Sequence, residues 1–235
     1  MTEIIAEVGQ NHNGDMHVAR RLIHAAKSAG ADVAKFQLYD AKKLFPKENN
    51  PWFDYNCKTE LSRENVKYLK SECDRIGIEF MASVFDIKRI KWLEDLGVAR
   101  HKMASRSIKD KELISALCET GKPLIISLGM WKGKRFPKFD TKAKVDYLYC
   151  ISEYPAELSK TDLQGIDFTQ YSGFSDHTIG ISAAIFALSK GARIIEKHFT
   201  IDKGMYGPDH SCSMTPDELN QINNFRRDLK ELVSQ

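Results

Sequence analysis

The chain has 235 residues, of which 42% are hydrophobic and 29% are charged, as in ordinary globular proteins with one large core. Its net charge of +3 is too small to indicate nucleic acid binding, and no apolar run is long enough to span a bilayer. Five scattered cysteines without CxxC spacing, together with a strand predicted close to Met1, favour a cytoplasmic protein without a signal peptide, disulfide framework or zinc cluster.

Short strands and amphipathic helices alternate along the chain. Apolar residues with a period of two predict strands, and apolar residues at helical spacing that end at Gly30, Gly77 or Gly121 predict helices. The predicted strands span residues 3–8, 32–38, 78–83, 99–104, 123–128, 145–150, 171–175 and 193–198. The predicted helices span residues 18–29, 61–76, 87–96, 109–120, 179–190 and 216–233, and residues 39–57 are predicted to be irregular.

One helix of this series is missing. Residues 131–144 contain Gly133, Pro137, five lysines and an arginine, and they show no helical spacing of apolar residues. Between residues 155 and 163 we predict at most a short helix. Eight strands with six clear helices therefore predict an α/β fold, a parallel (β/α)8 TIM barrel with a degenerate fifth helix. We expect a single catalytic domain over residues 1–235.

Polar side chains gather at the ends of the last two predicted strands. Ser175 and His177 share a face if the first of these strands extends that far, and Glu196 and His198 share a face of the second. Either histidine alone is as easily an ordinary buried residue. Two imidazoles at consecutive strand ends would reach the same place, which predicts two ligands of a metal site or a catalytic pair.

Charged residues also occupy strand positions that the period-two pattern assigns to the barrel interior. Lys35 shares a face with Val33, Glu7 shares a face with Ile5, and Lys102 lies near a strand end. A buried lysine or glutamate is costly unless it is paired, so these residues favour a site that binds a phosphate or a carboxylate. The alternative is that Lys35 and Lys102 point outward between helices and extend their amines to solvent.

Short motifs in a fixed order cover almost the whole chain. They are IIAEVGQNHNG at 4–14, AKFQ at 34–37, KMAS at 102–105, SLGM at 127–130, YP at 154–155, SDHT at 175–178, EKHF at 196–199, and GPDH at 207–210 followed by SM at 213–214. In order and spacing, these motifs resemble the barrel domain of the N-acetylneuraminate (sialic acid) synthase family.

The resemblance implies a transferase that condenses phosphoenolpyruvate (PEP) with an aldose, N-acetylmannosamine or a related sugar, to form a 2-keto-3-deoxy sugar acid and phosphate. It implies a divalent ion, Mn²⁺ or Mg²⁺, held by His177 and His198. It implies PEP contacts from Lys35, Lys102, Ser105, Ser127 and Ser175. It implies sugar contacts from Glu7, Gln37, Tyr154, Glu196 and Asp209. Glu7 or Glu196 would transfer protons, and the sequence does not choose between them.

The chain departs from the family pattern at several places. Leu128, Ser107 and residues 151–152 differ from the family's usual residues, and we expect the chain to lack the C-terminal antifreeze-like domain that supplies an arginine to a partner's barrel. Arg106 stands where the family has glycine. We predict that Arg106, with the basic residues of segment 132–138, supplies cationic cover for the substrates at the catalytic rim. The alternative is that these are solvated loop charges.

Three functions remain open from the sequence. The first is the PEP-dependent synthase, with PEP and an aldose as partners, no nucleic acid or membrane partner, and room for a homo-oligomer. The second is a related barrel synthase or metal-dependent aldolase that acts on a phosphorylated sugar, for which the basic segment after Met130 would bind the second phosphate. The third is a non-catalytic sugar-binding paralogue, which the intact histidines, lysines and glutamates disfavour.

Overall fold

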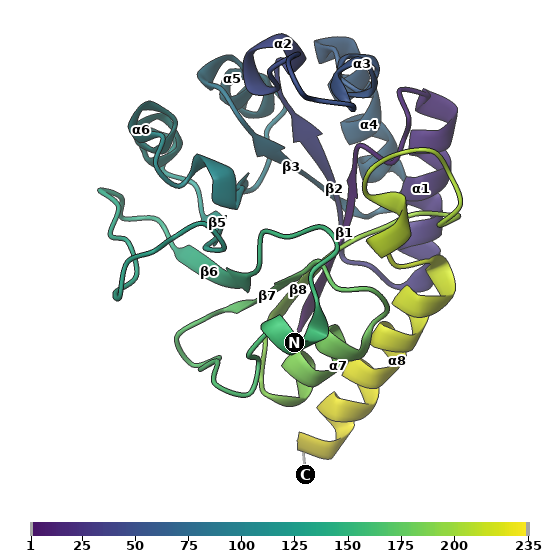
Figure 1. The fold of residues 1–235 in the computed structure, drawn as a ribbon, viewed down its shortest axis with the longest axis vertical. Coiled ribbons are helices and arrows are strands. Elements are labelled where there is room, and N and C mark those ends of the chain that lie inside the picture. Colours follow the sequence, from purple (N-terminus) through teal and green to yellow (C-terminus); the bar gives the residue numbers. More distant parts are fainter. Residues whose placement is uncertain (1, 234–235) are drawn as a thin grey trace.

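The protein is a closed barrel of parallel strands, seen in a computed structural model that describes residues 2–233. Each strand pairs with the next along the chain, and β8 pairs with β1 to close the sheet (Figure 1). This confirms the predicted (β/α)8 architecture. The eight strands within residues 2–233 are β1 Glu3–Gly9, β2 Val33–Leu38, β3 Glu79–Val84, β4 His101–Met103, β5 Leu124–Ser127, β6 Val145–Cys150, β7 Gly173–Asp176 and β8 Ile194–His198.

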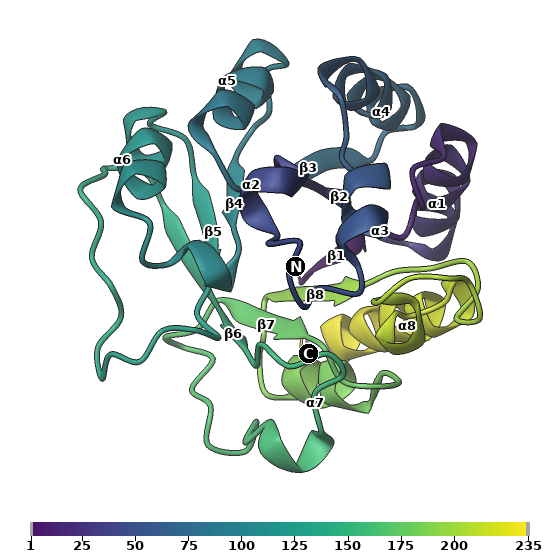
Figure 2. The same ribbon diagram turned by 45° about the horizontal axis from the view of Figure 1, so that its top comes forward.

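The helices form an incomplete ring around the strands (Figure 2). The six predicted helices form, and their bounds agree with the predicted ones to within about three residues. Capping groups set these ends: Ser62 and Asn65 form a capping box at the start of α4, and Gly30 adopts a left-handed φ of 98° after α1. The prediction that residues 39–57 are irregular is wrong in part, because Asp40 caps a short helix at residues 41–44 and a second one forms at residues 53–58. The helices are α1 Met16–Ala29, α2 Ala41–Leu44, α3 Phe53–Lys58, α4 Arg63–Ile76, α5 Ile87–Asp95, α6 Lys111–Glu119, α7 Ser182–Ser189 and α8 Pro216–Val233. Three 3₁₀ turns within the described residues are η1 Ser105–Ser107, η2 Leu158–Lys160 and η3 His210–Cys212.

Between β5 and β6 the chain forms an extended loop in place of a helix, as predicted (Figures 1 and 2). Aromatic side chains fasten this loop to the outside of the barrel. The ring of Phe136 lies 5.0 Å from that of Tyr147 on β6 and 4.7 Å from that of Tyr171, measured between ring centroids. The loop therefore covers the outer face of β6 where the helix would otherwise lie.

The barrel interior has an apolar middle. Buried side chains from six strands form one cluster there, consisting of Ile5, Val33, Met81, Ile125, Leu148 and Ile194. On β7 the corresponding position is Gly173, because a Cβ atom there would lie 1.9 Å from the carbonyl oxygen of Ile194. A separate and larger cluster lies between the outer face of the strands and the helices, as in other barrels of this type.

The amino-terminal end of the barrel is filled by an ion-pair cluster. Arg100, just before β4, donates two hydrogen bonds to Glu3 on β1 and two to Glu79 on β3, at 2.5–2.9 Å. Strand parity places all three side chains inside the barrel, below the apolar cluster. At the carboxyl-terminal end, the next interior positions beyond the apolar cluster are polar, and they form the floor of the site described below.

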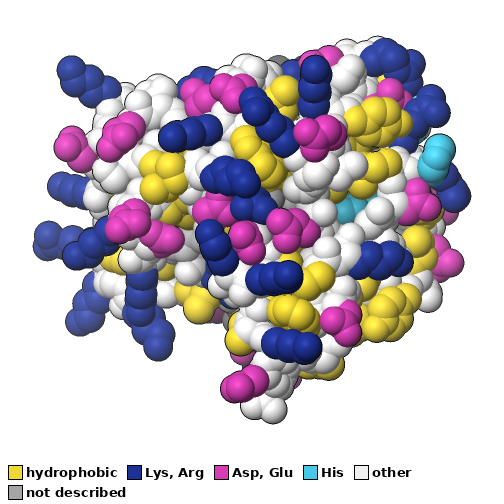
Figure 3. All heavy atoms as spheres, turned by 90° about the horizontal axis from the view of Figure 1, so that it is seen from above, with side chains coloured by type: hydrophobic (Ala, Val, Ile, Leu, Met, Phe, Trp, Pro, Cys, Tyr) yellow, Lys and Arg dark blue, Asp and Glu magenta, His cyan; other side chains and the backbone are white. Residues whose placement is uncertain are grey.

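The outside of the molecule is mixed in charge. On the face in Figure 3, acidic and basic side chains alternate, and lysines and arginines project at the left edge, the side on which the β5–β6 loop lies in Figure 1. No helix within residues 2–233 is both long enough and apolar enough to cross a membrane.

Candidate active site

A cavity of about 600 Å³ opens at the carboxyl-terminal ends of the strands, where barrel enzymes carry their active sites. The structure brings all of the residues predicted for the site to the wall of this one cavity, from the ends of seven strands and the loops that follow them. These residues are Glu7, Lys35, Gln37, Lys102, Ser105, Arg106, Ser127, Tyr154, Ser175, His177, Glu196, His198 and Asp209.

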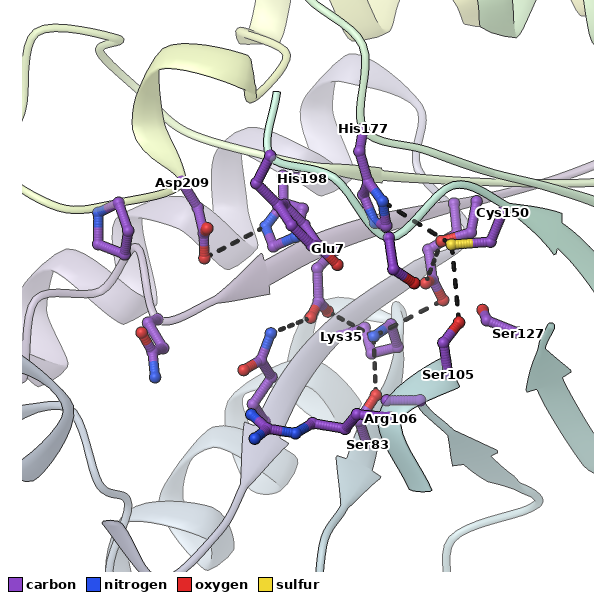
Figure 4. A pocket seen from close by; sticks show the side chains of 18 of the residues that line it. Glu7, Lys35, Ser83, Ser105, Arg106, Ser127, Cys150, His177, His198 and Asp209 are labelled. Carbon is purple, nitrogen blue, oxygen red and sulfur yellow. Dashed lines mark hydrogen bonds and ion pairs between the residues drawn. The ribbon is translucent and has the colours of Figure 1, made fainter. Parts of the chain in front are cut away.

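Lys35 on β2 lies at the centre of the floor. Its amine is 2.8 Å from a carboxylate oxygen of Glu7 and 3.6 Å from one of Glu196, and it donates a hydrogen bond of 3.0 Å to Ser83 on β3 (Figure 4). Although burial alone would lower the pKa of Lys35, the two carboxylates raise it above its ordinary value. Lys35 is therefore a fixed positive charge inside the barrel.

Lys102 on β4 is the second interior lysine. Its amine donates to Ser127 at 2.7 Å and to the carbonyl of Met103 at 3.1 Å, and it lies 3.7 Å from Glu196. Burial, and then repulsion from Lys35, outweigh the nearby carboxylates and lower the pKa of Lys102. Both lysines are almost fully buried, so the alternative that they point outward to solvent is wrong.

Glu196 on β8 connects the two lysines. Besides its contacts with them, it accepts a hydrogen bond of 2.9 Å from Ser175 on β7. Burial alone would raise the pKa of Glu196, but the charges of Lys102 and Lys35 lower it from 4.5 to about 2. Its carboxylate is therefore ionised throughout the physiological range.

The two predicted metal ligands lie side by side on one wall of the cavity. The ring centroids of His177 and His198 are 5.8 Å apart, and rings at roughly this separation can both reach one ion at nitrogen–metal distances of about 2.1 Å. The Nδ1 atom of His177 is 2.6 Å from the carbonyl of Ile151, which directs its other nitrogen away from that carbonyl.

His198 is buried, and its Nδ1 atom has no hydrogen-bond partner, with Asp209 at 3.8 Å. Burial lowers the pKa of His198 and favours the neutral imidazole that metals bind. Burial also opposes charge on His177, but its contacts with Cys150 and Ile151 raise its pKa, so an ion would compete with a proton there. Within residues 2–233 no three His, Cys, Asp or Glu side chains form a ready metal cluster. A pair of imidazoles fits an ion whose remaining positions are open to substrate and water.

The loop that carries His177 is held by a buried ion pair on the outer side of the barrel. Lys197 donates to Asp176 at 3.0 Å and to the carbonyl of Thr178 at 2.6 Å, and Asp176 also accepts from the backbone and hydroxyl of Thr178. This network joins β8 to the residues on both sides of His177. It fixes the position of that imidazole relative to His198.

The opening side of the cavity carries further polar groups. Gln37 donates to Glu7 at 2.9 Å, and the ring of Tyr154 lies 4.1 Å from that of His177. Gly9 bends β1 at this point with a φ of 52°, and a Cβ atom there would lie 3.2–3.4 Å from Gln37, Glu7 and His198. A glycine is therefore required for these side chains to approach one another.

The predicted cationic cover is present only in part. Arg106 on η1 lines the cavity, on the opposite side from His177 and His198 (Figure 4). None of Lys132, Lys134, Arg135 and Lys138 lines it. The prediction that this segment folds over the mouth is not borne out, because Phe136 fastens the loop to the outside of β6 instead.

Sequence reasoning missed part of the wall. Ser83 and Cys150 end β3 and β6 on the interior side, so strand parity could have identified both. A second group comes from the predicted irregular segment, which folds across the β2 side of the mouth, and no periodicity indicated this. It comprises Phe45, Asn50, Trp52 and Asn56.

Comparisons with known proteins agree with this geometry. Residues 22–235 match the model of the NeuB family. The N,N'-diacetyllegionaminic acid synthase of Legionella pneumophila is 36% identical, over 98% of this chain and 72% of its own length. The N-acetylneuraminate-9-phosphate synthase of Mus musculus is 32% identical, over 93% of this chain and 67% of its own. The crystal structure of N-acetylneuraminic acid (sialic acid) synthetase from Leptospira borgpetersenii in complex with citrate has a TM-score of 0.90 and 29% identity, and the match covers 100% of this chain and 85% of that chain.

Proposed function

The chain belongs to the NeuB family of synthases, and we propose that it condenses PEP with an aldose to form a 2-keto-3-deoxy sugar acid and phosphate. N-acetylmannosamine or a related sugar is the proposed acceptor. The proposed catalytic domain is a single barrel over residues 1–235.

The observation that carries the proposal is a floor of buried charge beside a pair of imidazoles. Lys35 and Lys102 are almost fully buried and point into the cavity, with hydroxyl groups around them. A packed barrel interior does not require such groups, and they are costly to bury. The two buried lysines would instead bind an anionic substrate, next to an electrophile that the metal activates.

In this scheme PEP lies over the lysines. Lys35 and Lys102 offset the charge of its phosphate and carboxylate, while Ser105, Ser127 and Ser175 offer hydroxyls at the surrounding strand ends. Carbon 3 of PEP bonds to the aldehyde carbon of the sugar, and the aldehyde oxygen takes up a proton to become a hydroxyl. The double bond of PEP supplies the electrons of this new bond, which leaves carbon 2 electron-poor, and water adds there and loses one proton. The bond between carbon 2 and the phosphate oxygen then breaks, the carbon 2 hydroxyl loses its proton, and carbon 2 becomes the ketone. Fixed cations suit this sequence because negative charge moves onto the departing phosphate.

His177 and His198 would hold the divalent ion, which when bound would polarise the sugar aldehyde as a Lewis acid. Two imidazole nitrogens favour Mn²⁺ over Mg²⁺, whose preferred ligands are oxygens. Asp209 lies 3.8 Å from Nδ1 of His198 and would orient that ring.

Two observations support Glu7 over Glu196 as the proposed proton carrier. Glu196 is enclosed by Lys35, Lys102 and Ser175, and its pKa of about 2 makes it a poor proton carrier at neutral pH. Its proposed role is to position the lysines. Glu7 bonds to Gln37 at the cavity wall, and we assign to it the transfer of a proton between water or the new hydroxyl and the solvent. Gln37, Tyr154 and Asp209 line the remaining space and would contact the sugar.

Phosphate release tests the proposal directly. Protein with Mn²⁺ and PEP should release phosphate only when an accepted aldose is present, in equal amount with a new 2-keto acid. Chelation should stop the release, and Mn²⁺ should restore it better than Mg²⁺. A panel of free and phosphorylated aldoses identifies the acceptor. Absence of phosphate release with every aldose, in protein that binds sugar, would instead support a binding paralogue.

A further inference from the structure

Arg106 is an exposed arginine whose guanidinium has no acidic partner. Within residues 2–233 it forms no ion pair. Its guanidinium stacks on the ring of Phe45 at 5.2 Å and donates one long hydrogen bond of 3.4 Å to the carbonyl of Leu44. These contacts hold the side chain against the segment after β2, at the mouth of the cavity.

The other basic side chains of the cavity wall are all compensated. Lys35 pairs with Glu7 and Glu196, Lys102 lies close to Glu196, and Lys197 pairs with Asp176. The Lys197–Asp176 pair is neutral and lies on the outer side of the barrel. Without Arg106, the two floor lysines would therefore face three carboxylates of the cavity wall, namely Glu7, Glu196 and Asp209. Arg106 therefore supplies the cation that is still available to an incoming anion.

The chemistry of the Arg106 side chain indicates which class of ligand it would bind. A guanidinium presents a planar set of donors that can bind a phosphate through two hydrogen bonds. Phe45 already holds the guanidinium of Arg106 in place by stacking before any ligand binds.

The place of Arg106 indicates which end of a substrate it meets. It lies across the cavity from His177 and His198 (Figure 4). A sugar with its aldehyde beside those histidines would extend toward Arg106, whereas the floor at Lys102 and Ser127 lies deeper in the barrel.

Resting on the proposed function, we propose that Arg106 is a specificity residue that binds a substrate phosphate at the mouth of the cavity. The phosphate has two sources, a phosphorylated acceptor sugar or PEP itself. The geometry favours the far end of a phosphorylated sugar, and the chain would then take sugar phosphates in preference to free sugars.

Equilibrium titration tests this without turnover. The probes are PEP, N-acetylmannosamine and N-acetylmannosamine 6-phosphate, added to wild type, Arg106→Gln, Arg106→Lys and Arg135→Gln. Arg135→Gln is the matched control, because it removes the same charge from the β5–β6 loop outside the cavity. Arg106→Gln should weaken the binding of a phosphate-bearing probe by roughly 10- to 100-fold, as expected for a charge-assisted contact. Arg106→Lys should recover part of that loss, and the control and the free sugar should not change.

The pattern across probes identifies the source. Loss confined to the sugar phosphate assigns the contact to the acceptor, and loss confined to PEP assigns it to PEP. In turnover, the change should raise KM for that substrate far more than it lowers kcat. Changes below twofold for both phosphate probes would overturn the proposal. These titrations measure binding without reaction. A failure of the protein to condense PEP with an aldose is therefore distinguishable from unchanged phosphate binding in Arg106→Gln.

Discussion

The two ends of this barrel both carry ion pairs, but the pairs are built differently. At the amino-terminal end, the partly buried Arg100 makes four hydrogen bonds of 2.5–2.9 Å to Glu3 and Glu79. At the carboxyl-terminal end, the almost fully buried Lys35 pairs with Glu7 at 2.8 Å, and Lys35 and Lys102 share Glu196 at 3.6 and 3.7 Å. The guanidinium of the first cluster is bound by its own carboxylates. The second cluster holds Glu196 between two lysines in looser contacts, which a substrate anion could take over.

This difference also explains why one end is closed by its own ion pairs while the other can bind a ligand. Bidentate pairs fix their partners and leave no group to bind a ligand. In the open cluster, one carboxylate oxygen of Glu196 is buried without a hydrogen-bond partner, and it lies 3.6 Å from the amine of Lys35. Buried polar groups with unused capacity are uncommon and often mark functional sites. The comparison predicts that changes at the amino-terminal end alter stability alone, while changes at the carboxyl-terminal end also alter binding and turnover.

The largest effect is expected from the imidazoles. His177→Ala and His198→Ala should each abolish turnover, because two imidazoles would hold the ion and either change would leave only one of them. The fold should persist, since neither ring belongs to the apolar clusters. Circular dichroism and thermal unfolding check the fold, and binding of Mn²⁺ checks the site. Metal-dependent turnover that survives in His198→Ala would refute the metal assignment.

The lysines should give the next effect. Lys35→Met and Lys102→Met should each weaken PEP binding by roughly 10- to 100-fold, because each removes a charge-assisted contact in a dry site. Sugar binding should change less. Isothermal titration of PEP into each folded variant measures the loss, and unchanged affinity in both would mean that PEP binds elsewhere.

Arg100→Met is the control for these lysines, since it removes a partly buried cation from the opposite end. It should destabilise the fold by about 2 kcal/mol, because it leaves the partly buried carboxylates of Glu3 and Glu79 close together without their shared partner. PEP affinity should stay at the wild-type value. If Arg100→Met lost as much PEP binding as Lys35→Met, the prediction that only the carboxyl-terminal cluster binds PEP would be wrong.

How much of this could be predicted from the sequence depends on whether a residue lies in a strand. Period-two alternation placed Glu7, Lys35 and Glu196 inside the barrel correctly, because the register of a closed sheet leaves a side chain only two directions. The ends of the first two predicted helices followed from Gly30 and Gly77, which adopt the left-handed conformation that stops a helix. The missing fifth helix was visible as a lack of apolar spacing.

Loops were predicted less well, because long-range contacts decide where they fold. The basic segment after Met130 was expected over the mouth, but Phe136 packs on Tyr147 and Tyr171 and holds it outside. Conversely, the segment after β2 was treated as irregular, although Phe45 and Trp52 form part of the cavity wall. Neither contact leaves a periodic signal in the chain. The direction of Arg106 depended on the position of Phe45 and was settled by the structure alone.

The smallest expected effect is a change in how stability depends on pH. Lys102 and Lys35 lower the pKa of Glu196 from 4.5 to about 2 in the folded state. A carboxylate with a depressed pKa stabilises the fold above the pKa of the unfolded chain, and this stabilisation is lost as the pH falls toward the folded value. Wild type should therefore lose about 1–2 kcal/mol from this group between pH 5 and pH 3.

Glu196→Gln cannot titrate, so its stability should decline less steeply over the same range, and the two proteins should approach each other at low pH. Glu119→Gln, which changes an exposed carboxylate on α6, is the control and should follow the wild-type slope. Urea denaturation at steps of half a pH unit measures all three. If Glu196→Gln and wild type decline in parallel, Glu196 is not held ionised by the lysines. The floor of the cavity would then be a neutral network, and the contrast between the two ends of the barrel would have to be explained by geometry without charge.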